Sequence, residues 1–287
     1  MTNLSGKKAI VTGANSGLGY QTALELARRG AQVVLAVRNL EAGEASVAKI
    51  LTAVPEATVS VAHLDLSSLE SVSNFSAQQA GEPLDILVNN AGIMGPAFAW
   101  SKDGIESQMA TNHIGHFALT AGLMPALGQV AGARVVSLSS VYHRRGKFAD
   151  GSATELRGTE TGYDRWACYG QTKLACLMFA LELDKRVKTA GMDLVSVAAH
   201  PGWAATGLQK GDDARGNGLA QSAAVGARSQ IMAATDSTVS GGSFVGPRLE
   251  IWGKPRVFTG AKHAYDQQMW SSLWVASEEL SGVKFSV

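Results

Sequence analysis

The sequence predicts an α/β fold in which a doubly wound parallel sheet of about seven strands carries helices on both faces. Short apolar runs alternate with longer amphipathic segments along most of the 287 residues, an order typical of strand–helix–strand units with right-handed crossovers. The apolar runs are almost unbroken, as expected of strands covered on both faces. No internal repeat or low-complexity linker interrupts this order, so we expect residues 1–287 to form a single domain.

Six apolar runs are predicted to be strands. In chain order they are residues 9–11, 33–37, 59–63, 86–88, 135–138 and 194–198. Five amphipathic segments are predicted to be the helices between them: residues 17–29, 40–53, 69–79, 104–127 and 167–188. The first helix is followed by Gly30 and carries two arginines in its last turn, a common way for a helix to end.

The composition favours a well-buried globular protein. Apolar residues make up 46% of the chain and charged residues 17%, which disfavours a disordered or fibrous chain. The net charge of +1 gives no electrostatic reason to expect nucleic acid or an anionic membrane as a partner. There is no apolar stretch of about twenty residues, and two cysteines do not suggest a disulfide framework. We therefore expect a soluble, cytoplasmic protein without a membrane anchor.

A glycine-rich turn joins the first predicted strand to the first predicted helix. Residues 12–19 read TGANSGLG, so Gly13, Gly17 and Gly19 give the pattern G-x-x-x-G-x-G. Glycines let the backbone approach a pyrophosphate closely, and the start of the helix faces its negative charge. Such glycines can also serve a tight turn alone, but the strand before and the helix after favour a dinucleotide site. We expect Asn15, Ser16 and Leu18 to contact the cofactor as well.

Five further motifs follow in chain order. They are Asp65-Leu66 after the third strand, Asn89-Asn90-Ala91-Gly92 after the fourth, Asn112 in the next helix, Ser139-Ser140 closing the fifth strand with Tyr169-Gly170-Gln171-Thr172-Lys173 beyond it, and Pro201-Gly202 after the sixth strand with Thr206 four residues on. With the glycine turn, this series covers about the whole chain and resembles the short-chain dehydrogenase/reductase family.

The resemblance implies a Rossmann fold and an oxidoreductase that interconverts an alcohol and a ketone or aldehyde. It implies that the following residues bind the nicotinamide cofactor: Asp65, Leu66, Asn89, Ala91, Gly92, Tyr169, Lys173, Pro201, Gly202 and Thr206. It also implies a catalytic Asn112, which would hold a water linking Lys173 to solvent. Members of the family commonly pair two helices across a two-fold axis, so a homodimer or homotetramer is expected.

The predicted chemistry centres on Tyr169. Reducing a carbonyl requires a proton donor beside the hydride donor, and a tyrosine hydroxyl, which ordinarily titrates near pH ~10, needs a nearby cation to serve at neutrality. Lys173 lies four residues further along a predicted helix and therefore on the same face. Ser140 is expected to hold the substrate oxygen by a hydrogen bond. Ser139 is the competing choice, but the serine that ends the strand fits the family better.

Ser140 and Tyr169 lie 29 positions apart (169 − 140), which is wider than the commonest spacing in the family. Similar insertions occur in its retinol-dehydrogenase-like branch, which the segments LAVRN, TNHIGHF and VSLSSVYH also resemble. Three segments are expected to form the substrate site with the tail at residues 246–287: residues 93–101, 141–166 and 203–219. Their apolar and aromatic residues, Met94, Trp100, Trp203 and Trp252, favour an apolar carbonyl or alcohol.

The end of the second strand predicts the cofactor. An NAD-preferring enzyme of this architecture usually has a carboxylate there, which binds the ribose hydroxyls and would repel a 2′-phosphate. This chain has Val37 and then Arg38, whose planar guanidinium suits a phosphate. A solvated arginine is the simpler interpretation, but we predict NADP(H) in preference to NAD(H).

Other polar residues are interpreted as structural. His113 and His116 could lie together on a helix, but no carboxylate or cysteine accompanies them, so no metal site is expected. The basic cluster at residues 143–147 is interpreted as a solvated loop. Nothing marks Cys168 as an activated thiolate, and His200 is expected to pack at a strand end.

Two alternative functions stay open. A cofactor-binding sensor that has kept the fold without catalysis should have lost its tyrosine or lysine, whereas this chain has both. A sugar-nucleotide epimerase or dehydratase usually carries a larger carboxy-terminal substrate domain, and only about forty residues follow the last apparent strand.

Overall fold

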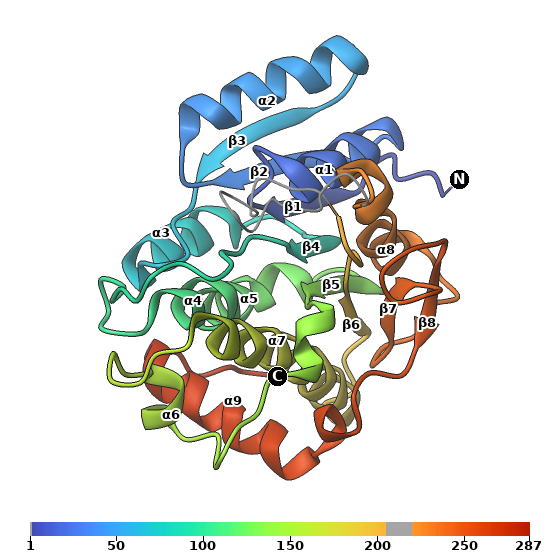
Figure 1. The fold of residues 1–287 in the computed structure, drawn as a ribbon. Coiled ribbons are helices and arrows are strands. Elements are labelled where there is room, and N and C mark those ends of the chain that lie inside the picture. Colours follow the sequence, from blue (N-terminus) through green and yellow to red (C-terminus); the bar gives the residue numbers. More distant parts are fainter. Residues whose placement is uncertain (1, 205–219) are drawn as a thin grey trace.

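One eight-stranded sheet runs through the structure, a computed structural model that describes residues 2–204 and 220–287 (Figure 1). The strand order is β3-β2-β1-β4-β5-β6-β7-β8. The strands are β1 (Lys8–Thr12), β2 (Gln32–Val37), β3 (Val59–His63), β4 (Ile86–Asn89), β5 (Ala133–Leu138), β6 (Leu194–Ala199), β7 (Phe244–Pro247) and β8 (Pro255–Phe258). All neighbours are parallel except β7 and β8. The order reverses between β1 and β4, which is where α/β sheets of this kind open a binding crevice.

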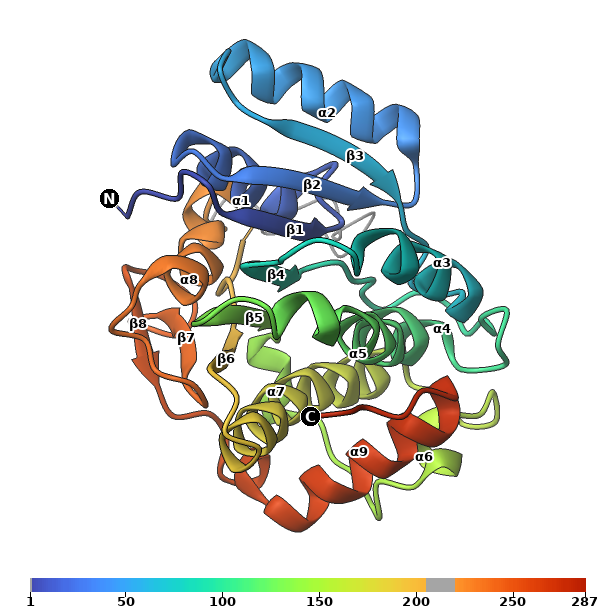
Figure 2. The same cartoon turned by 180° about the vertical axis from the view of Figure 1, so that it is seen from behind.

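Helices cover both faces of the sheet, and the described residues form three apolar clusters, two of which lie against the sheet's helices as follows. One core joins the sheet to α1 (Gly17–Arg28), α2 (Leu40–Ala53) and α8 (Ala223–Thr235). The other joins it to α3 (Leu69–Gln79), α5 (Gly115–Leu127) and α7 (Arg165–Thr189). Outside α5 and α7 lies α9 (Gln267–Ser281) (Figure 2). Its Trp274 stacks on Phe179 with ring centroids 5.9 Å apart. The fold class is therefore confirmed, with an eighth strand beyond the seven expected.

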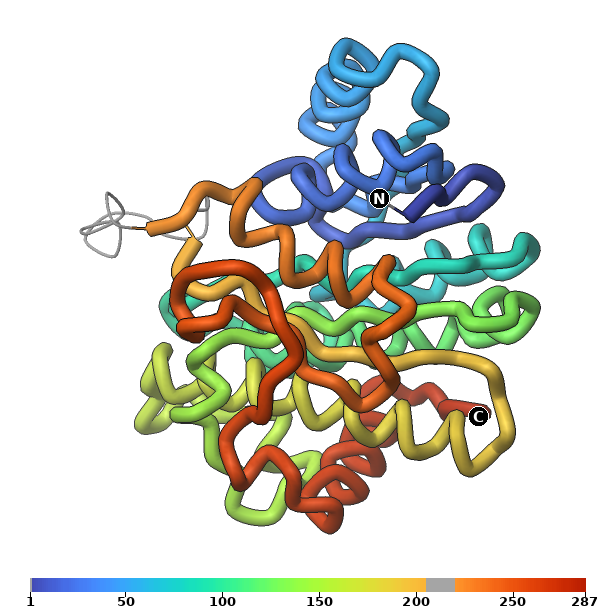
Figure 3. The backbone as a smooth tube through the Cα atoms, turned by 90° about the vertical axis from the view of Figure 1, so that its right-hand side faces the viewer, coloured from blue at the N-terminus to red at the C-terminus, as the bar shows by residue number. Residues whose placement is uncertain are grey.

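The elements that sequence analysis missed lie mainly near the carboxy terminus. Strands β7 and β8 have only four residues each and form a hairpin at the edge of the sheet, so neither shows a long apolar run. At the opposite edge, α2 and β3 form one end of the molecule (Figure 3). None of the helices in residues 2–204 and 220–287 is long and apolar enough to cross a membrane.

Two predicted helices have different starts in the structure. Residues 104–127 form α4 (Ser107–Met109), a π-helical turn (Ala110–Ile114) and then α5. Helix α7 begins two residues before the predicted position because the Asp164 carboxylate accepts the N–H groups of Trp166 and Ala167 as an N-cap. The predicted loop between β5 and α7 contains the short helix α6 (Ala153–Arg157).

Candidate active site

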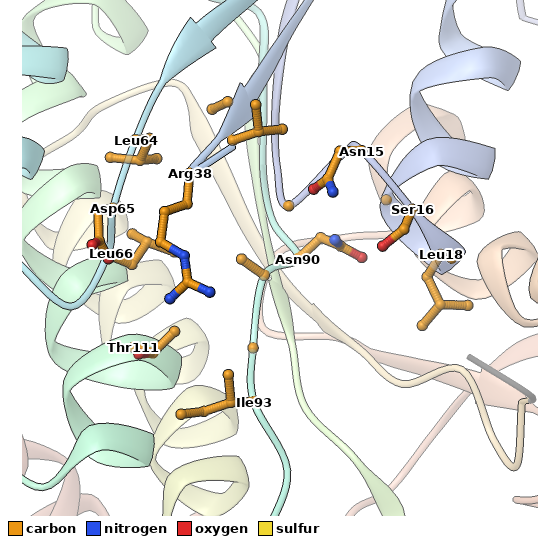
Figure 4. Close-up of a pocket in the computed structure, with 17 residues that line it drawn as sticks. Asn15, Ser16, Leu18, Arg38, Leu64, Asp65, Leu66, Asn90, Ile93 and Thr111 are labelled. Carbon is orange, nitrogen blue, oxygen red and sulfur yellow. The ribbon is translucent and has the colours of Figure 1, made fainter. Parts of the chain in front are cut away.

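A cleft of about 260 Å³ opens where the chain leaves β1, β2, β3 and β4 (Figure 4). Eleven residues that sequence analysis assigned to the cofactor line it: Gly13, Asn15, Ser16, Gly17, Leu18, Gly19, Arg38, Asp65, Leu66, Ala91 and Gly92. Val37 also lines it, together with five residues that were not assigned: Ala36, Leu64, Asn90, Ile93 and Thr111. The motifs of four separate strand ends therefore meet in one cavity.

The glycine turn has a backbone that only glycine adopts easily. Gly13 has φ 64° and Gly17 has φ 54°, both in the left-handed region. A Cβ at Gly13 would lie 3.0 Å from the Cα of Ala91, so the turn packs directly on the loop after β4. Ser16, the N-cap of α1, makes no side-chain cap, and the first-turn N–H groups of α1 are left for another acceptor. This is the arrangement in which helix starts bind phosphate.

Arg38 extends into the cleft from the end of β2. In Figure 4 its side chain lies between Asp65 and Leu66 on one side and Asn90 on the other. Burial raises the pKa of the Asp65 carboxyl, but hydrogen bonds from Ser67 (2.6 Å from its hydroxyl) and the charge of Arg38 hold it below the usual value. Arg38 is exposed and makes no hydrogen bond or ion pair with any residue the structure describes. Its guanidinium is therefore available to an anion in the cleft.

Thr12, at the end of β1, holds the loop after β4. Its hydroxyl oxygen accepts the N–H groups of Asn90 and Ala91, both at 2.9 Å, and lies 2.9 Å from Nε2 of His116. Asn89 does not line the cleft, because it is buried and donates instead to the hydroxyl of Thr120 (3.0 Å). Successive strand residues point to opposite faces, so of this pair only Asn90 reaches the cavity.

Asn112 lies in the π-helical turn and holds the loop after β4 by hydrogen bonds at Ile93. Its Oδ1 accepts the N–H of Ile93 (2.8 Å), and its Nδ2 donates to the carbonyl of Ile93 and the hydroxyl of Thr172 (both 3.0 Å). Its backbone carbonyl accepts from Nδ1 of His116 (3.0 Å) and Sγ of Cys176 (3.1 Å). Asn112 thus joins the cofactor cleft to α7, and its expected role in holding a water stays a prediction.

Lys173 reaches from α7 towards this loop. Its Nζ donates to the carbonyl of Leu138 (3.0 Å) and lies 5.7 Å from the ring centroid of Tyr169. A Cβ at Gly92 would be 3.5 Å from the same Nζ, so the buried ammonium lies at the edge of the cofactor cleft. Tyr169 and Lys173 do not themselves line the described cleft, and Lys173 is the one of the two that lies against Gly92 at its edge.

The two serines after β5 have different surroundings. Ser139 is buried, and its hydroxyl donates to the carbonyl of Lys173 (2.7 Å). Ser140 is half-buried, and its hydroxyl oxygen accepts only a long bond (3.3 Å), from the N–H of Tyr142, among the described residues. The ring of Tyr142 packs on that of Tyr169 with centroids 5.4 Å apart. Ser140 is therefore the serine with a hydroxyl available beside Tyr169.

Pro201 and Gly202 lie after β6, near the glycine turn. A Cβ on Gly226 of α8 would meet side-chain atoms of both Leu18 and Pro201. Gly202 has φ 72° and donates its N–H to Nδ1 of His200 (3.2 Å). The prediction for Thr206, and most of the expected substrate segment 203–219, lies outside the described residues.

The aromatic side chains beside Tyr169 differ from those used to predict the substrate class. Trp166 lies 6.4 Å from Tyr169 and 5.6 Å from Tyr142 between ring centroids. Its ring lies against Gly95, where a Cβ would be 3.3 Å away. By contrast, Trp100 is half exposed. Tyr142 follows Ser140 by two positions and Trp166 precedes Tyr169 by three, a proximity in sequence that could have identified both.

The buried carboxylate of Glu106 joins its own segment to the residues around the start of α7. Its oxygens accept from the hydroxyl of Tyr163 (3.1 Å) and Sγ of Cys168 (3.0 Å). Burial and the charge of Glu106 raise the pKa of the Cys168 thiol, in agreement with the interpretation that it is no activated thiolate. Gln108 adds bonds to Tyr163 (2.8 Å) and to the N–H of Gly95 (2.9 Å).

His113, His116 and His200 are buried and hydrogen-bonded. His113 lies 2.8 Å from the hydroxyl of Ser277, and no group of three potential metal ligands occurs in the described part of the chain. Burial lowers the pKa of His113 to about 3 and that of His116 to about 4. His200 packs between Phe244 and Phe258, as expected of a strand-end residue.

The interpretation of residues 143–147 as a solvated loop was wrong for His143. Arg144, Arg145 and Lys147 are exposed, but the side chain of His143, in the turn that follows Ser140, is buried and only 1% exposed. The sequence does not distinguish one ring buried by a later segment from its charged neighbours.

Known proteins resemble this chain over most of its length. A family model described as short chain dehydrogenase matches residues 7–151. Human retinol dehydrogenase 13 is 36% identical over 98% of this chain and 86% of its own length. Bovine retinol dehydrogenase 12 is 42% identical over 69% of this chain, and that match spans 62% of the bovine protein. Short-chain dehydrogenase TIC 32 B of Brassica napus chloroplasts is 40% identical over 70% of this chain and 64% of its own.

Solved structures agree. An uncharacterized protein of Mycobacterium paratuberculosis is 38% identical, with a TM-score of 0.85 over 100% of this chain and 97% of that one. A short chain dehydrogenase of Shigella flexneri, complexed with NADP, shares the fold at 20% identity, with a TM-score of 0.68 over 86% of this chain and 99% of that one. The motifs, the sheet and these relatives lead to one conclusion: the chain is an oxidoreductase of the short-chain dehydrogenase/reductase family, in its retinol-dehydrogenase-like branch.

Proposed function

We propose that this protein is an NADP(H)-dependent oxidoreductase that interconverts an apolar alcohol and its ketone or aldehyde, with Tyr169 as general acid and base. The observation that carries the proposal is the meeting of three side chains beside the cofactor cleft. Lys173 lies at the Gly92 edge of that cleft, Tyr169 lies beneath Lys173, and Ser140 follows the strand end to which Lys173 is bonded.

The described residues fit a nicotinamide dinucleotide. The uncapped start of α1 offers N–H groups to a pyrophosphate. The half-buried Asp65 and the buried Leu66 offer a polar and an apolar contact to the adenosine half. When bound, a reduced nicotinamide supplies a hydride to a carbonyl carbon.

Arg38 supports NADP(H) over NAD(H). The side chain of Val37 is 1% exposed and has no polar group for the ribose hydroxyls. Arg38, in contrast, offers the cleft a guanidinium that no residue in the described ranges pairs with. Such a planar cation binds a phosphate with two parallel hydrogen bonds. A bound NADP in the Shigella relative is consistent with this preference.

Tyr169, Ser140 and Lys173 have different tasks in the proposed reaction. In reduction, the Tyr169 hydroxyl gives its proton to the substrate oxygen while the Ser140 hydroxyl donates a hydrogen bond to that oxygen. The Lys173 ammonium has three donors, and one is used by the Leu138 carbonyl. The remaining two are available to the tyrosine oxygen, where a cation stabilises the phenolate, and to a ribose hydroxyl. Oxidation of the alcohol follows the same steps in reverse.

The substrate class follows from the wall around Tyr169. Tyr142 and Trp166 present aromatic surface there, and aromatic walls favour apolar and unsaturated groups. Retinol dehydrogenases 12 and 13 are relatives of this chain, so a retinoid aldehyde belongs in the first set of substrates tested.

The test is NADPH absorbance with a panel of apolar aldehydes and ketones that includes retinal, for the wild type and Tyr169→Phe. Turnover by the wild type with nearly complete loss in the variant is expected. A wild type that binds NADPH tightly but turns over nothing across a broad panel would favour the catalytically silent, cofactor-binding alternative.

A further inference from the structure

The turn that follows Ser140 contains a buried histidine that the proposed chemistry does not use. Residues Val141–Arg144 form a 3-10 turn, and Ser140 is its N-cap. His143 is 1% exposed, and its ring lies edge-on to Phe244 with centroids 5.2 Å apart. The backbone N–H and the ring Nδ1 of His143 both donate to the same carbonyl oxygen. The N–H of His143 is 3.0 Å, and its Nδ1 2.6 Å, from the carbonyl oxygen of Ser140.

The other ring nitrogen binds a segment more than a hundred residues away. Nε2 of His143 accepts the N–H of Ala261 at 3.1 Å. A backbone N–H can only donate and a carbonyl can only accept, so the two partners together require the neutral tautomer with its proton on Nδ1. Burial lowers the pKa of His143 to about 4, with a smaller contribution from the charge of Arg144. The ring is therefore held in one orientation and one protonation state at neutral pH.

Two further bonds join the same turn to the segment after β7. Nε2 of His263 donates to the carbonyl of His143 (3.3 Å), and Arg144 pairs with Glu250 at 2.8 Å. The second is an exposed ion pair, which contributes little to stability. The buried link through the imidazole is thus the strongest connection between the tail and the turn.

We propose that His143 is a positioning residue for Ser140. The imidazole fixes the carbonyl of Ser140 and thereby the direction of its hydroxyl, and the N–H of Ala261 fixes the imidazole. The part of the tail at residues 255–265 would in this way determine how well the Ser140 hydroxyl is oriented towards a substrate oxygen. The inference rests on the proposed role of Ser140 in the reaction.

Two substitutions separate the two bonds of the ring. The amide of His143→Asn reaches about where Nδ1 lies and can still donate to Ser140, whereas the amide of His143→Gln reaches about where Nε2 lies and can still accept from Ala261. Misplacement of a reacting group by about 1 Å can cost about a hundredfold in rate, and the backbone N–H of His143 remains as a second donor. We therefore expect His143→Gln to lower kcat on the order of tenfold, with the Kd for NADPH unchanged.

His143→Asn should lose clearly less kcat than His143→Gln, while amide hydrogen exchange at Ala261 becomes faster in the asparagine variant only. Thermal unfolding of both variants reports any loss of fold. Equal losses of kcat in both, or a wild-type kcat in His143→Gln, would overturn the proposal. Ala261→Pro is a variant that leaves the ring in place. Proline suits the φ of −61° at this position and removes the N–H. A small but measurable loss of kcat is expected, and an unchanged kcat would overturn the coupling of the tail to Ser140.

A double-mutant cycle distinguishes this inference from the proposed function. If His143 acts through Ser140, then His143→Gln should cause almost no further loss of kcat in a Ser140→Ala background. Additive losses would contradict the inference. A wild-type kcat in Ser140→Ala would overturn the proposed role of Ser140 and the inference together, whereas a slow Ser140→Ala beside an unaffected His143→Gln would overturn the inference alone.

Discussion

Replacing Arg38 with alanine tests the proposed cofactor preference, because it removes a charge from the cleft with little risk to the fold. The side chain is exposed and bonds to no residue in the described ranges. Its positive charge acts on the nearby carboxylate of Asp65. The variant should therefore keep its stability, and any change in nucleotide binding should reflect the loss of the guanidinium.

The expected magnitude follows from the exposure of the site. A hydrogen bond to a charged group contributes about 1.5–3 kcal/mol, and we take the lower part of that range because solvent reaches Arg38. About 1.5–2 kcal/mol corresponds to a weakening of about 10- to 30-fold. The loss of Arg38 also leaves the negative charge of Asp65 less compensated in the cleft, which disfavours a 2′-phosphate bound there. NADH lacks this phosphate, so its affinity should change far less.

The assay is a pair of fluorescence titrations, with NADPH and NADH, at one fixed ionic strength because salt screens exposed charges. Lys49→Ala is the matched control, since Lys49 is exposed on α2, does not line the cleft, and its loss changes the net charge equally. The control should leave both affinities unchanged. Equal losses of NADPH and NADH binding in Arg38→Ala, or a wild type that prefers NADH, would refute the reasoning.

Three other predictions concern catalysis and acid stability. Tyr169→Phe should bind NADPH normally but lose on the order of a hundred- to ten-thousand-fold in kcat, since the ring packing stays; near-normal turnover would exclude Tyr169 as the acid. Ser140→Ala should lower kcat with little effect on the Kd for NADPH, whereas Lys173→Ala should impair both, and identical profiles in kinetics and titration would contradict that division. The free energy of unfolding should decrease as the pH is lowered from about 6.5 to about 4, because His116 and His143 bind protons near pH 6.5 in the unfolded chain but only near pH 4 in the folded one. Thermal unfolding midpoints that stay constant over this range would contradict this prediction.

Local patterns were enough to predict most of the residues that line the cleft after β1 to β4. The glycines at 13, 17 and 19 require a turn between a strand and a helix, and parallel strands end at the same edge of a sheet. Arg38, Asp65 and Ala91 therefore had to meet the glycine turn, and they line one cleft with it. Helix periodicity likewise put Tyr169 and Lys173 on one face of α7.

Asn89 shows where such reasoning ends. Three residues of the motif Asn89-Asn90-Ala91-Gly92 line the cleft, but the asparagine that reaches the cavity is Asn90 and not the predicted Asn89. The choice depends on how the strand end is rotated against Thr12 and Thr120, which no local pattern encodes.

The sequence by itself determined the fold class, the family and most of the residues that line the cleft after β1 to β4, because these depend on spacing along strands and helices. Tertiary structure alone decided which polar groups are already occupied. The Ser139 hydroxyl donates to a backbone carbonyl of α7, which leaves the Ser140 hydroxyl available. His143 looks like part of a charged loop until a segment more than a hundred residues away covers it and bonds to its ring. Burial and hydrogen-bond partners arise from contacts between distant segments, so only the folded chain defines them.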